Sequence, residues 1–379
     1  MQYRRLGKTN LMVSEVGFGG EWLERHDEAH SINLVRHAGE KGINIIDCWM
    51  PDPKSRDIIG KAIADQRDKW YVQGHIGSTW QGGQYVRTRD MAFVKPAFED
   101  LLARIGGGYI DLGMIHYVDS MEDWHACMDT EYIDYVHELH ARGIIRHIGL
   151  STHNPRIAKL AAESGFIEMI LFSINPAFDM RPASENLDDM FGEYDAALSG
   201  IDPERAALYR LCEEKDVGIT VMKGFFGGAL FDPKRSPFGA TFTPAQLIHY
   251  ALTRPAVASI LCGYDGPEQV DAAVAYETAT PDERDYASVI AGAPLHSYMG
   301  QCTYCGHCKP CPMNIDIAMV NKLYDLASAQ PEVPQSVREH YRALDPGADA
   351  CVGCQSCEER CPFGVKIAER MAKAAELFK

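Results

Sequence analysis

The sequence predicts an α/β protein, a (β/α)8 TIM barrel followed by a small, mainly helical, cysteine-rich domain. Two observations lead to this prediction. Short apolar segments alternate with periodic, charge-rich segments over residues 13–276, and most of the 12 cysteines lie near the C-terminus. A chain of 379 residues, 46% of them hydrophobic, can fill one barrel and one added module. We expect the barrel to span 1–285 and the second domain 286–379, because scattered Pro and Gly mark the junction.

The predicted strands have the length and apolar content of buried barrel strands. They are residues 13–18, 43–47, 70–74, 109–115, 146–150, 168–174, 217–222 and 257–261. The segments between them are helical in period, and 131–142 is an example that Gly143 ends. Its apolar face carries Tyr132, Ile133, Val136 and Leu139. Repeated β-then-α units favour a closed barrel over an open sheet, and no GxGxxG motif follows the first strand. Residues 178–202, long and acidic, are expected to cover the substrate.

Two cysteine motifs near the C-terminus have nearly the same spacing. The first runs Cys-x2-Cys-x2-Cys-x2-Cys-Pro over 302–312, and the second runs Cys-x2-Cys-x2-Cys-x3-Cys-Pro over 351–362. This pattern is typical of two [4Fe–4S] clusters, in which the last cysteine of each motif ligates the cluster of the other. The expected ligands are Cys302, Cys305, Cys308 and Cys361 for one cluster, and Cys351, Cys354, Cys357 and Cys311 for the other. Zinc, the alternative, usually uses two CxxC pairs without a third equally spaced cysteine.

The segment between the motifs, 312–350, contains helix-like stretches, which predicts a helical ferredoxin-like module. A formal net charge of −16 at pH 7 argues against nucleic acid, which needs clustered Lys and Arg. No apolar stretch approaches the roughly 18 residues of a membrane span, and the N-terminus lacks the apolar core of a secretory signal. Thiolate ligands are typical of a reducing compartment. We expect a cytoplasmic protein without membrane partners, whose acidic surface suits a redox partner protein.

Several segments resemble, in the same order, marker segments of the aldo-keto reductases. They are YRRLGKTNLMVSEVGFGG, GINIID, YIDLGMIH, GIIRHIGLS and ILCGYDGPEQV. The cysteine-rich end resembles the ferredoxin-fused branch of the same superfamily, so the resemblance covers nearly the whole chain. It implies a TIM barrel whose active site lies at the C-terminal ends of the strands.

The resemblance implies an active site of Asp, Tyr, Lys and His, in which the Tyr protonates a carbonyl while a nicotinamide delivers hydride. The Asp corresponds to Asp47 and the His to His116. The Tyr position holds Asp52, the Lys position after the third strand holds His75, and residues 48–60 contain no Tyr. Two of the four groups are therefore replaced, and a divergent chemistry is expected.

We expect His75 to act as the general acid, because the carboxylate of Asp47 favours its imidazolium form. His116 is expected to hydrogen-bond the reacting oxygen beside it. Asp52 is a poorer donor, because a carboxyl group is normally ionised. In an alternative, Asp47, His75 and His116, together with His153, hold a divalent metal ion. No HxH or HxxxH spacing supports that alternative.

The resemblance places Ser151 and Asn175 near a nicotinamide amide, and Lys223 and the loop beginning at Gly263 near the pyrophosphate and adenosine. This loop has no Arg or Lys for a 2′-phosphate, and Asp265 would repel one. NAD(H) is therefore the candidate nicotinamide and NADPH is disfavoured; loss of the nucleotide site is the alternative. A flavin stays open, because barrels bind flavin phosphate through late-strand loops without a strong motif.

These inferences favour an oxidoreductase that acts on a carbonyl, hydroxyl or activated C–O group of a small polar molecule, sugar-like or aromatic. Aromatic residues that follow the first four strands could wall its pocket: Trp22, Trp49, Trp80 and Tyr117. One alternative is a non-redox lyase or isomerase with structural clusters. Another is an electron-transfer adaptor whose barrel is a docking body. Since clusters pass single electrons and hydride carries two, the sequence leaves the role of the clusters open.

Overall fold

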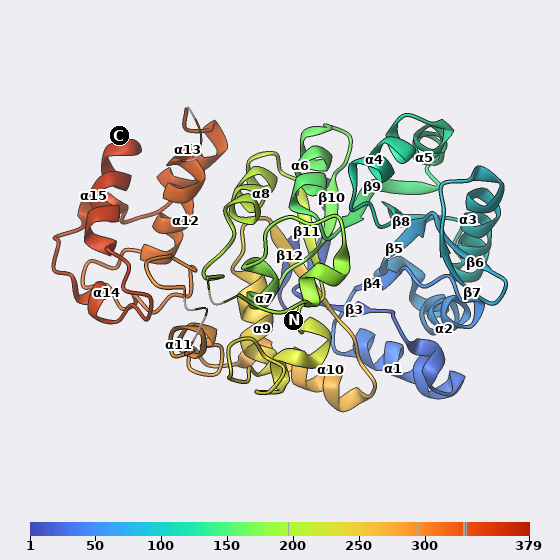
Figure 1. Ribbon diagram of the computed structural model, residues 1–379, viewed down its shortest axis with the longest axis horizontal. Coiled ribbons are helices and arrows are strands. Elements are labelled where there is room, and N and C mark those ends of the chain that lie inside the picture. The colour runs from blue at the N-terminus through green and yellow to red at the C-terminus, as the bar shows by residue number, and fades with distance from the viewer. Residues whose placement is uncertain (196, 295, 297, 329, 331) are drawn as a thin grey trace.

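The computed structural model describes residues 1–379 except residues 196, 295, 297, 329 and 331. Its centre is a closed barrel of eight parallel strands. In barrel order they are β3 (Val16–Gly19), β4 (Ile45–Cys48), β5 (Tyr71–Ile76), β8 (Ile110–Ile115), β9 (Ile145–Thr152), β10 (Met169–Ser173), β11 (Gly218–Met222) and β12 (Val257–Cys262). All eight predicted strands are present, with helices around them (Figure 1), so the predicted (β/α)8 barrel is confirmed.

The first predicted strand, 13–18, is divided in the structure. Two short strands precede the barrel, β1 (Tyr3–Arg5) and β2 (Met12–Ser14). They pair with each other in an antiparallel hairpin, and only β3 joins the barrel. Glu15 separates β2 from β3, and its carboxylate accepts a hydrogen bond from the Arg4 guanidinium at 2.6 Å. This ion pair ties the hairpin to the barrel.

Most helices outside the strands begin at a side chain that caps them, such as Asp27 on α1 and Asn154 on α6, whereas α10 begins at Gly266 without one. Those of the barrel are α1 (Glu28–Glu40), α2 (Pro53–Ile63), α3 (Met91–Ile105), α4 (Met121–Met128), α5 (Glu131–Ala141), α6 (Pro155–Glu163), α7 (Pro176–Asp179), α8 (Pro203–Glu214), α9 (Pro244–Leu252) and α10 (Pro267–Val274). Short 3-10 turns are η1 (Gly7–Thr9), η2 (Leu23–Arg25), η3 (Ala64–Lys69), η4 (Leu187–Phe191), η5 (Phe226–Phe231), η6 (Ala275–Thr278) and η7 (Ala348–Ala350). Helix α5 matches the predicted 131–142, and Gly143 follows it with φ +70°.

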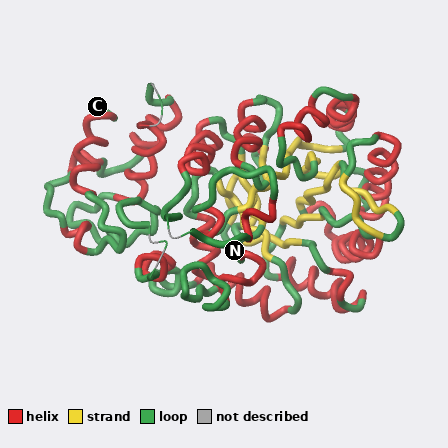
Figure 2. Tube along the Cα trace, viewed as in Figure 1, coloured by secondary structure: helices red, strands yellow, loops and turns green. Residues whose placement is uncertain are grey.

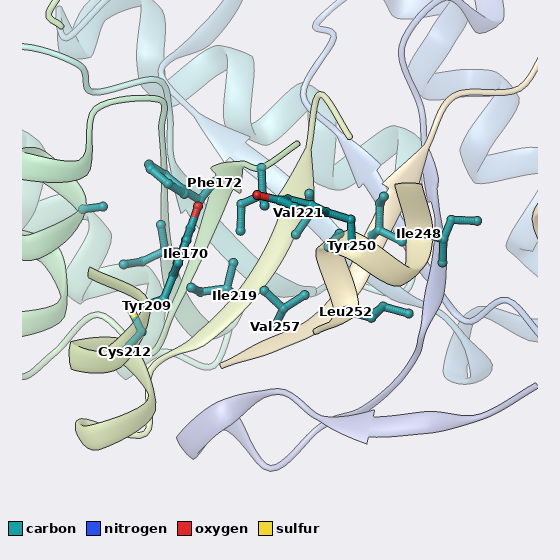
Figure 3. Packing of buried hydrophobic residues seen from close by; sticks show 14 of the residues in the cluster. Ile170, Phe172, Tyr209, Cys212, Ile219, Val221, Ile248, Tyr250, Leu252 and Val257 are labelled. Carbon is teal, nitrogen blue, oxygen red and sulfur yellow. The ribbon is translucent and has the colours of Figure 1, made fainter. Parts of the chain in front are cut away.

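The main core lies between the strands and the surrounding helices, and Figure 3 shows part of it. The labelled side chains belong to β10, β11, β12, α8 and α9: Ile170, Phe172, Tyr209, Cys212, Ile219, Val221, Ile248, Tyr250, Leu252 and Val257. A smaller apolar cluster fills the barrel interior and includes Leu6 and Val13 from the N-terminal hairpin. The hairpin therefore closes one end of the barrel, and the carboxyl ends of the strands form the opposite end.

A second hairpin, absent from our sequence prediction, follows β5. Its strands β6 (Ser78–Gln81) and β7 (Gln84–Arg87) pair antiparallel. Gly82 and Gly83 form the turn between them with φ values of +58° and +80°, which two-residue hairpin turns require. Figure 1 shows β6 and β7 beside α3, on the side of the barrel away from the C-terminal domain.

The predicted covering segment, 178–202, is mostly irregular and contains only the end of α7 and η4 among its described residues; residue 196 lies outside them. Phe191 stacks on Phe226 with ring centroids 5.2 Å apart, which holds the segment against the residues that follow β11. Its role in covering the substrate stays a prediction.

The C-terminal part consists of helices and loops, whereas the strands gather in the barrel (Figure 2). Its helices are α11 (Tyr286–Ala291), α12 (Ile317–Ser328), α13 (Gln335–Arg342), α14 (Ser356–Glu359) and α15 (Ile367–Leu377). The Tyr298 hydroxyl donates to the Pro176 carbonyl at 2.6 Å, and Arg254 donates to the Thr303 carbonyl at 2.5 Å. These bonds join the two parts, and the boundary at 285/286 stays a prediction. No helix in the described ranges is long and apolar enough to cross a bilayer.

Candidate active site and cluster sites

Three predicted catalytic side chains meet at the carboxyl ends of neighbouring strands. Asp47 lies on β4, His75 on β5, and His116 directly follows β8. The His75 Nε2 lies 2.8 Å from the Asp47 Oδ1, and the His75 Nδ1 lies 2.8 Å from the His116 Nδ1. The three residues are only 5%, 2% and 4% exposed. The structure therefore brings together the three groups that the sequence suggested, as a buried chain.

Sequence reasoning missed a fourth member of this chain, Tyr85. Its hydroxyl lies 2.7 Å from the His116 Nε2. The residue belongs to β7, so the second hairpin carries it to the mouth of the barrel. Its ring meets that of Trp49 edge-on at 5.3 Å, and Trp49 lies parallel to the His116 ring at 6.1 Å. Gly82-Gly83 between two short alternating segments was the available signal for this hairpin.

Buried polar partners continue the chain into the barrel interior. The Gln73 side-chain amide donates to the Asp47 carboxylate at 3.1 Å, and its carbonyl accepts from the Thr220 hydroxyl at 2.9 Å. Gln73 and His75 therefore both contact the same carboxylate oxygen of Asp47, Oδ1. The amide of Gln73 links the chain to Thr220 on β11.

The geometry argues against the divalent-metal alternative. Both ring nitrogens of His75 and of His116 already have hydrogen-bond partners, so neither offers a free lone pair to an ion. His153 is held separately, its Nδ1 2.9 Å from the Asp119 Oδ2. Within the described part of the chain, no group of three His, Cys, Asp or Glu side chains is arranged to hold a single metal ion.

Burial decides where this chain can hold charge. Burial lowers the pKa of His116 well below its usual value, and the nearby His75 and Arg89 lower it further. Burial raises the pKa of Tyr85 to about 12, although Arg87 and Arg89 oppose this shift. His116 and Tyr85 are therefore neutral near pH 7. His75 Nε2 lies 2.8 Å from the Asp47 carboxylate, the acidic group of this chain.

Asp52 caps a helix, and its catalytic role stays a prediction. Its carboxylate accepts the Ser55 backbone N–H at 3.0 Å and so caps α2, which begins at Pro53. An Asp-Pro pair at a helix start satisfies an exposed backbone donor, which stabilises the helix locally. Among the described contacts, Asp52 makes none to the Asp47–His75–His116 chain.

The residues expected near a nicotinamide amide are already engaged. The Ser151 hydroxyl oxygen accepts the Tyr117 N–H at 2.7 Å. The Asn175 side chain accepts from the Phe178 N–H and donates to the Lys223 carbonyl, at 2.8 and 2.9 Å. A nicotinamide amide would have to share or displace these bonds. The amide-binding positions therefore fit the group only in part.

The positions expected near the phosphates are more open. An added Cβ at Gly263 would meet nothing within 4 Å, so the backbone there faces free space. The Asp265 side chain is 71% exposed, and His26 and His30 from the start of the barrel contact this residue at 3.5 and 2.9 Å. The Lys223 ammonium lies 3.8 Å from the Glu21 carboxylate, where burial raises the pKa of Glu21.

Two cavities in the C-terminal part are lined by cysteines. The inner cavity has Cys302, Cys305, Cys308 and Cys361 in its wall. The outer cavity has Cys311, Cys351, Cys354 and Cys357. Each therefore collects three cysteines of one motif and the last cysteine of the other. Thr303 Oγ1 and His307 Nδ1, on residues that line the inner cavity, are buried without a hydrogen-bond partner among the described residues, as donors to a cluster would be.

A barrel with a buried Asp–His–His chain at its carboxyl end, joined to a cysteine-lined helical domain, defines an enzyme of the barrel class with an iron–sulfur module. The sequence profile of the Aldo/keto reductase family matches residues 15–246, and that of the 4Fe-4S dicluster domain matches residues 298–365. The chain belongs to the aldo/keto reductase family and carries a 4Fe-4S dicluster domain.

Individual relatives agree with this assignment. An uncharacterized oxidoreductase of Bacillus subtilis, YqkF, is 25% identical over 281 residues, which are 71% of this chain and 89% of that protein. The holo form of aldo-keto reductase AKR11C1 from Bacillus halodurans superposes with a TM-score of 0.60 and 22% identity, over 79% of this chain and 98% of its own. An aldo-keto reductase from Klebsiella pneumoniae, solved with NADPH, has a TM-score of 0.55 and 16% identity, over 78% and 95%. The two structures share the fold, and the family match identifies an oxidoreductase.

Proposed function

We propose that the protein reduces a carbonyl group of a small polar molecule, or oxidises the corresponding hydroxyl, with Asp47, His75 and His116 as its acid–base chain. The observation that carries the proposal is the buried hydrogen-bonded chain at the carboxyl ends of neighbouring strands. Catalytic groups of barrel enzymes lie at this end. Trp49 beside His116 offers an apolar wall that suits a sugar-like or aromatic substrate.

The chain is suited to holding one proton. Asp47 accepts the His75 Nε2–H and so directs the other nitrogen of that ring toward His116. His116 is kept neutral by its surroundings, and the proposed carrier of the added proton is His75, whose Nε2 faces the Asp47 carboxylate. A bound reduced nicotinamide would supply the hydride that such a reduction needs. The proton then comes from the protein, and its source is this chain.

NADH is the proposed nicotinamide, and we expect NADPH to bind more weakly. The loop beginning at Gly263 presents the exposed carboxylate of Asp265 and no Arg or Lys. Calorimetry with both nucleotides checks this expectation, and Asp265→Asn should strengthen NADPH binding while leaving NADH binding unchanged. Tight NADPH binding to the unaltered protein would refute it. If neither nucleotide binds, the electron donor is of another kind, and a bound flavin is then the next candidate to assay.

The two cavities are the proposed sites of the [4Fe–4S] clusters, with the crossed ligands expected from the spacing. The outer cavity is the proposed entry for electrons from a redox partner protein, because Cys354 is exposed and Val352 beside it is 64% exposed. The cysteines outside the motifs are buried and unpaired: Cys48, Cys127, Cys212 and Cys262. Free thiols support the proposal of a reducing, cytoplasmic location.

The decisive experiment separates a redox enzyme from the two other classes. The protein is reconstituted anaerobically and mixed with a panel of sugars and aromatic carbonyl compounds. Its electrons come either from added NADH or from its own clusters, which are chemically reduced beforehand. We expect product formation to match the electrons consumed, two per carbonyl reduced. Product without electron consumption would establish a lyase or isomerase. Electron transfer to an added carrier protein without product would establish an adaptor.

A further inference from the structure

We propose that Tyr85 is the catalytic residue that touches the reacting oxygen and passes the proton between it and the Asp47–His75–His116 chain. The proposal rests on the acid–base chain proposed above and adds its point of contact with the substrate. It assigns to the β6–β7 hairpin the function that our sequence prediction gave to the histidines themselves.

The four side chains of the chain differ in their exposure to solvent. Asp47, His75 and His116 are almost completely buried, so they offer a substrate little exposed surface. Tyr85 lies at the accessible end of the same chain and is half-buried. Its neighbour Gln84 is exposed, as expected when successive side chains of a strand point to opposite faces. The hairpin therefore directs the Tyr85 hydroxyl into the barrel mouth and leaves Gln84 outside.

The side chains of the chain also differ in how many hydrogen-bonding positions they have left for a substrate. Each imidazole has two nitrogens, and in His75 and His116 both are occupied. A substrate oxygen could bind either ring only by breaking the chain. A phenol has one O–H and two lone pairs, and the contact with the His116 Nε2 uses one of these three. Among the three rings of the chain, Tyr85 is the one that can bind a substrate oxygen while the chain stays intact.

The chain has two consistent proton arrangements. In the first, the Tyr85 O–H donates to His116 Nε2, the His116 Nδ1–H donates to His75 Nδ1, and the His75 Nε2–H donates to Asp47. Adding one proton makes His75 an imidazolium that donates from both nitrogens. His116 then accepts at Nδ1 and donates from Nε2 to the Tyr85 oxygen. The Tyr85 O–H is thereby released and can point at a substrate oxygen.

Reduction starts from the protonated arrangement and ends in the neutral one. The carbonyl carbon receives the hydride as a new C–H bond, and the C=O π electrons move to oxygen, which takes the Tyr85 proton. The Tyr85 oxygen takes the proton from His116 Nε2, and His116 Nδ1 takes the proton from His75 Nδ1. One hydride and one proton are consumed, and a solvent proton restores His75. Oxidation of an alcohol runs through the same positions in reverse.

Proton transfer from His75 through His116 explains how Tyr85, a weak acid, can protonate the substrate. With its pKa raised to about 12, an isolated Tyr85 would form the phenolate only at high cost. Proton supply from His116 in the same step means that no free phenolate accumulates. The short contacts of 2.7, 2.8 and 2.8 Å place each donor next to its acceptor before the reaction begins.

Tyr85→Phe tests the proposal, because it removes the hydroxyl and keeps the ring contacts with Trp49 and His116. We expect turnover to fall ~10²–10⁴-fold, as for loss of a positioned proton donor, with cluster content and thermal unfolding unchanged. The matched control is Gln84→Ala on the same strand, which should keep normal turnover. Near-normal turnover of Tyr85→Phe would overturn the proposal.

A second measurement does not depend on activity. In protein labelled with ¹⁵N in histidine, Tyr85→Phe should change the resonance of the His116 Nε2 and leave that of His147, near the amino-terminal end of β9, unchanged. An unchanged His116 signal would also overturn the proposal. If His75→Gln is inactive while Tyr85→Phe is active, the acid–base chain stands and Tyr85 is not its contact. If both variants are active, the proposed acid–base function itself fails.

Discussion

Cys361→Ser is expected to destroy the cluster whose other ligands are Cys302, Cys305 and Cys308, although it lies in the other motif. The reason is that Cys361 lies in the wall of the inner cavity with those three residues. Loss of one of four thiolates leaves a cubane open to solvent and to loss of iron. Iron and sulfide analysis, together with electron paramagnetic resonance of the reduced protein, measures the effect. The unaltered protein should hold about eight iron and eight sulfide, as two cubanes require.

The matched control is Cys354→Ser, which should damage the outer cluster and spare the inner one. The crossed arrangement is refuted if Cys361→Ser affects only the cluster bound by Cys351, Cys354 and Cys357. Iron near four per chain, or zinc in place of iron, in the unaltered protein would contradict the presence of two clusters.

His75→Gln is expected to lose turnover ~10²–10⁴-fold with both clusters intact. A Gln side chain can still hydrogen-bond, so Asp47 need not lose its partner. Unlike the imidazole of His75, Gln cannot hold the additional proton that the chain releases during reduction. Steady-state turnover on a substrate identified by the panel above measures the loss. Absorbance of the clusters and thermal unfolding should match those of the unaltered protein.

His147→Gln is the control for removing a histidine from a carboxylate pair. His147 lies 3.0 Å from Glu168 toward the amino-terminal end of β9, away from the barrel mouth, and should be dispensable for turnover. Normal activity in His75→Gln would show that the proton comes from elsewhere. A similar loss in both variants would show that the effect comes from altered packing and not from proton transfer.

The strands were predictable because each is a short apolar run between helices of clear period, and this pattern is local in the chain. The division of 13–18 was not predictable to the same degree. Two strands with similar apolar content are separated only by Glu15, and the pairing of β2 with β1 decides which of them enters the barrel. β1 and β2 form a local hairpin, but the barrel partner of β3 is β12, which is distant in sequence. The point at which the barrel strand begins therefore leaves no local signal at Glu15.

The tyrosine that contacts His116 lies outside the loop to which the family resemblance points. Residues 48–60, where the family resemblance directed attention, contain no Tyr, whereas Tyr85 reaches His116 from a hairpin after the next strand. Only the closed barrel shows that the ends of β4, β5 and β8 and this hairpin share one space. Asp52 illustrates the opposite case, since its capping of α2 is local and readable from Asp-Pro.

By itself, the sequence determined the barrel, the helical cysteine-rich module and the groups at the strand ends, because strand periodicity, cysteine spacing and marker segments are local properties. Only the tertiary structure decided which groups are linked and which remain accessible. It joined Asp47, His75 and His116 through hydrogen bonds between residues far apart in the chain, and it added Tyr85. The physical reason is that barrel closure sets the distances between strand ends. Those distances decide whether a side chain is a buried link or remains accessible.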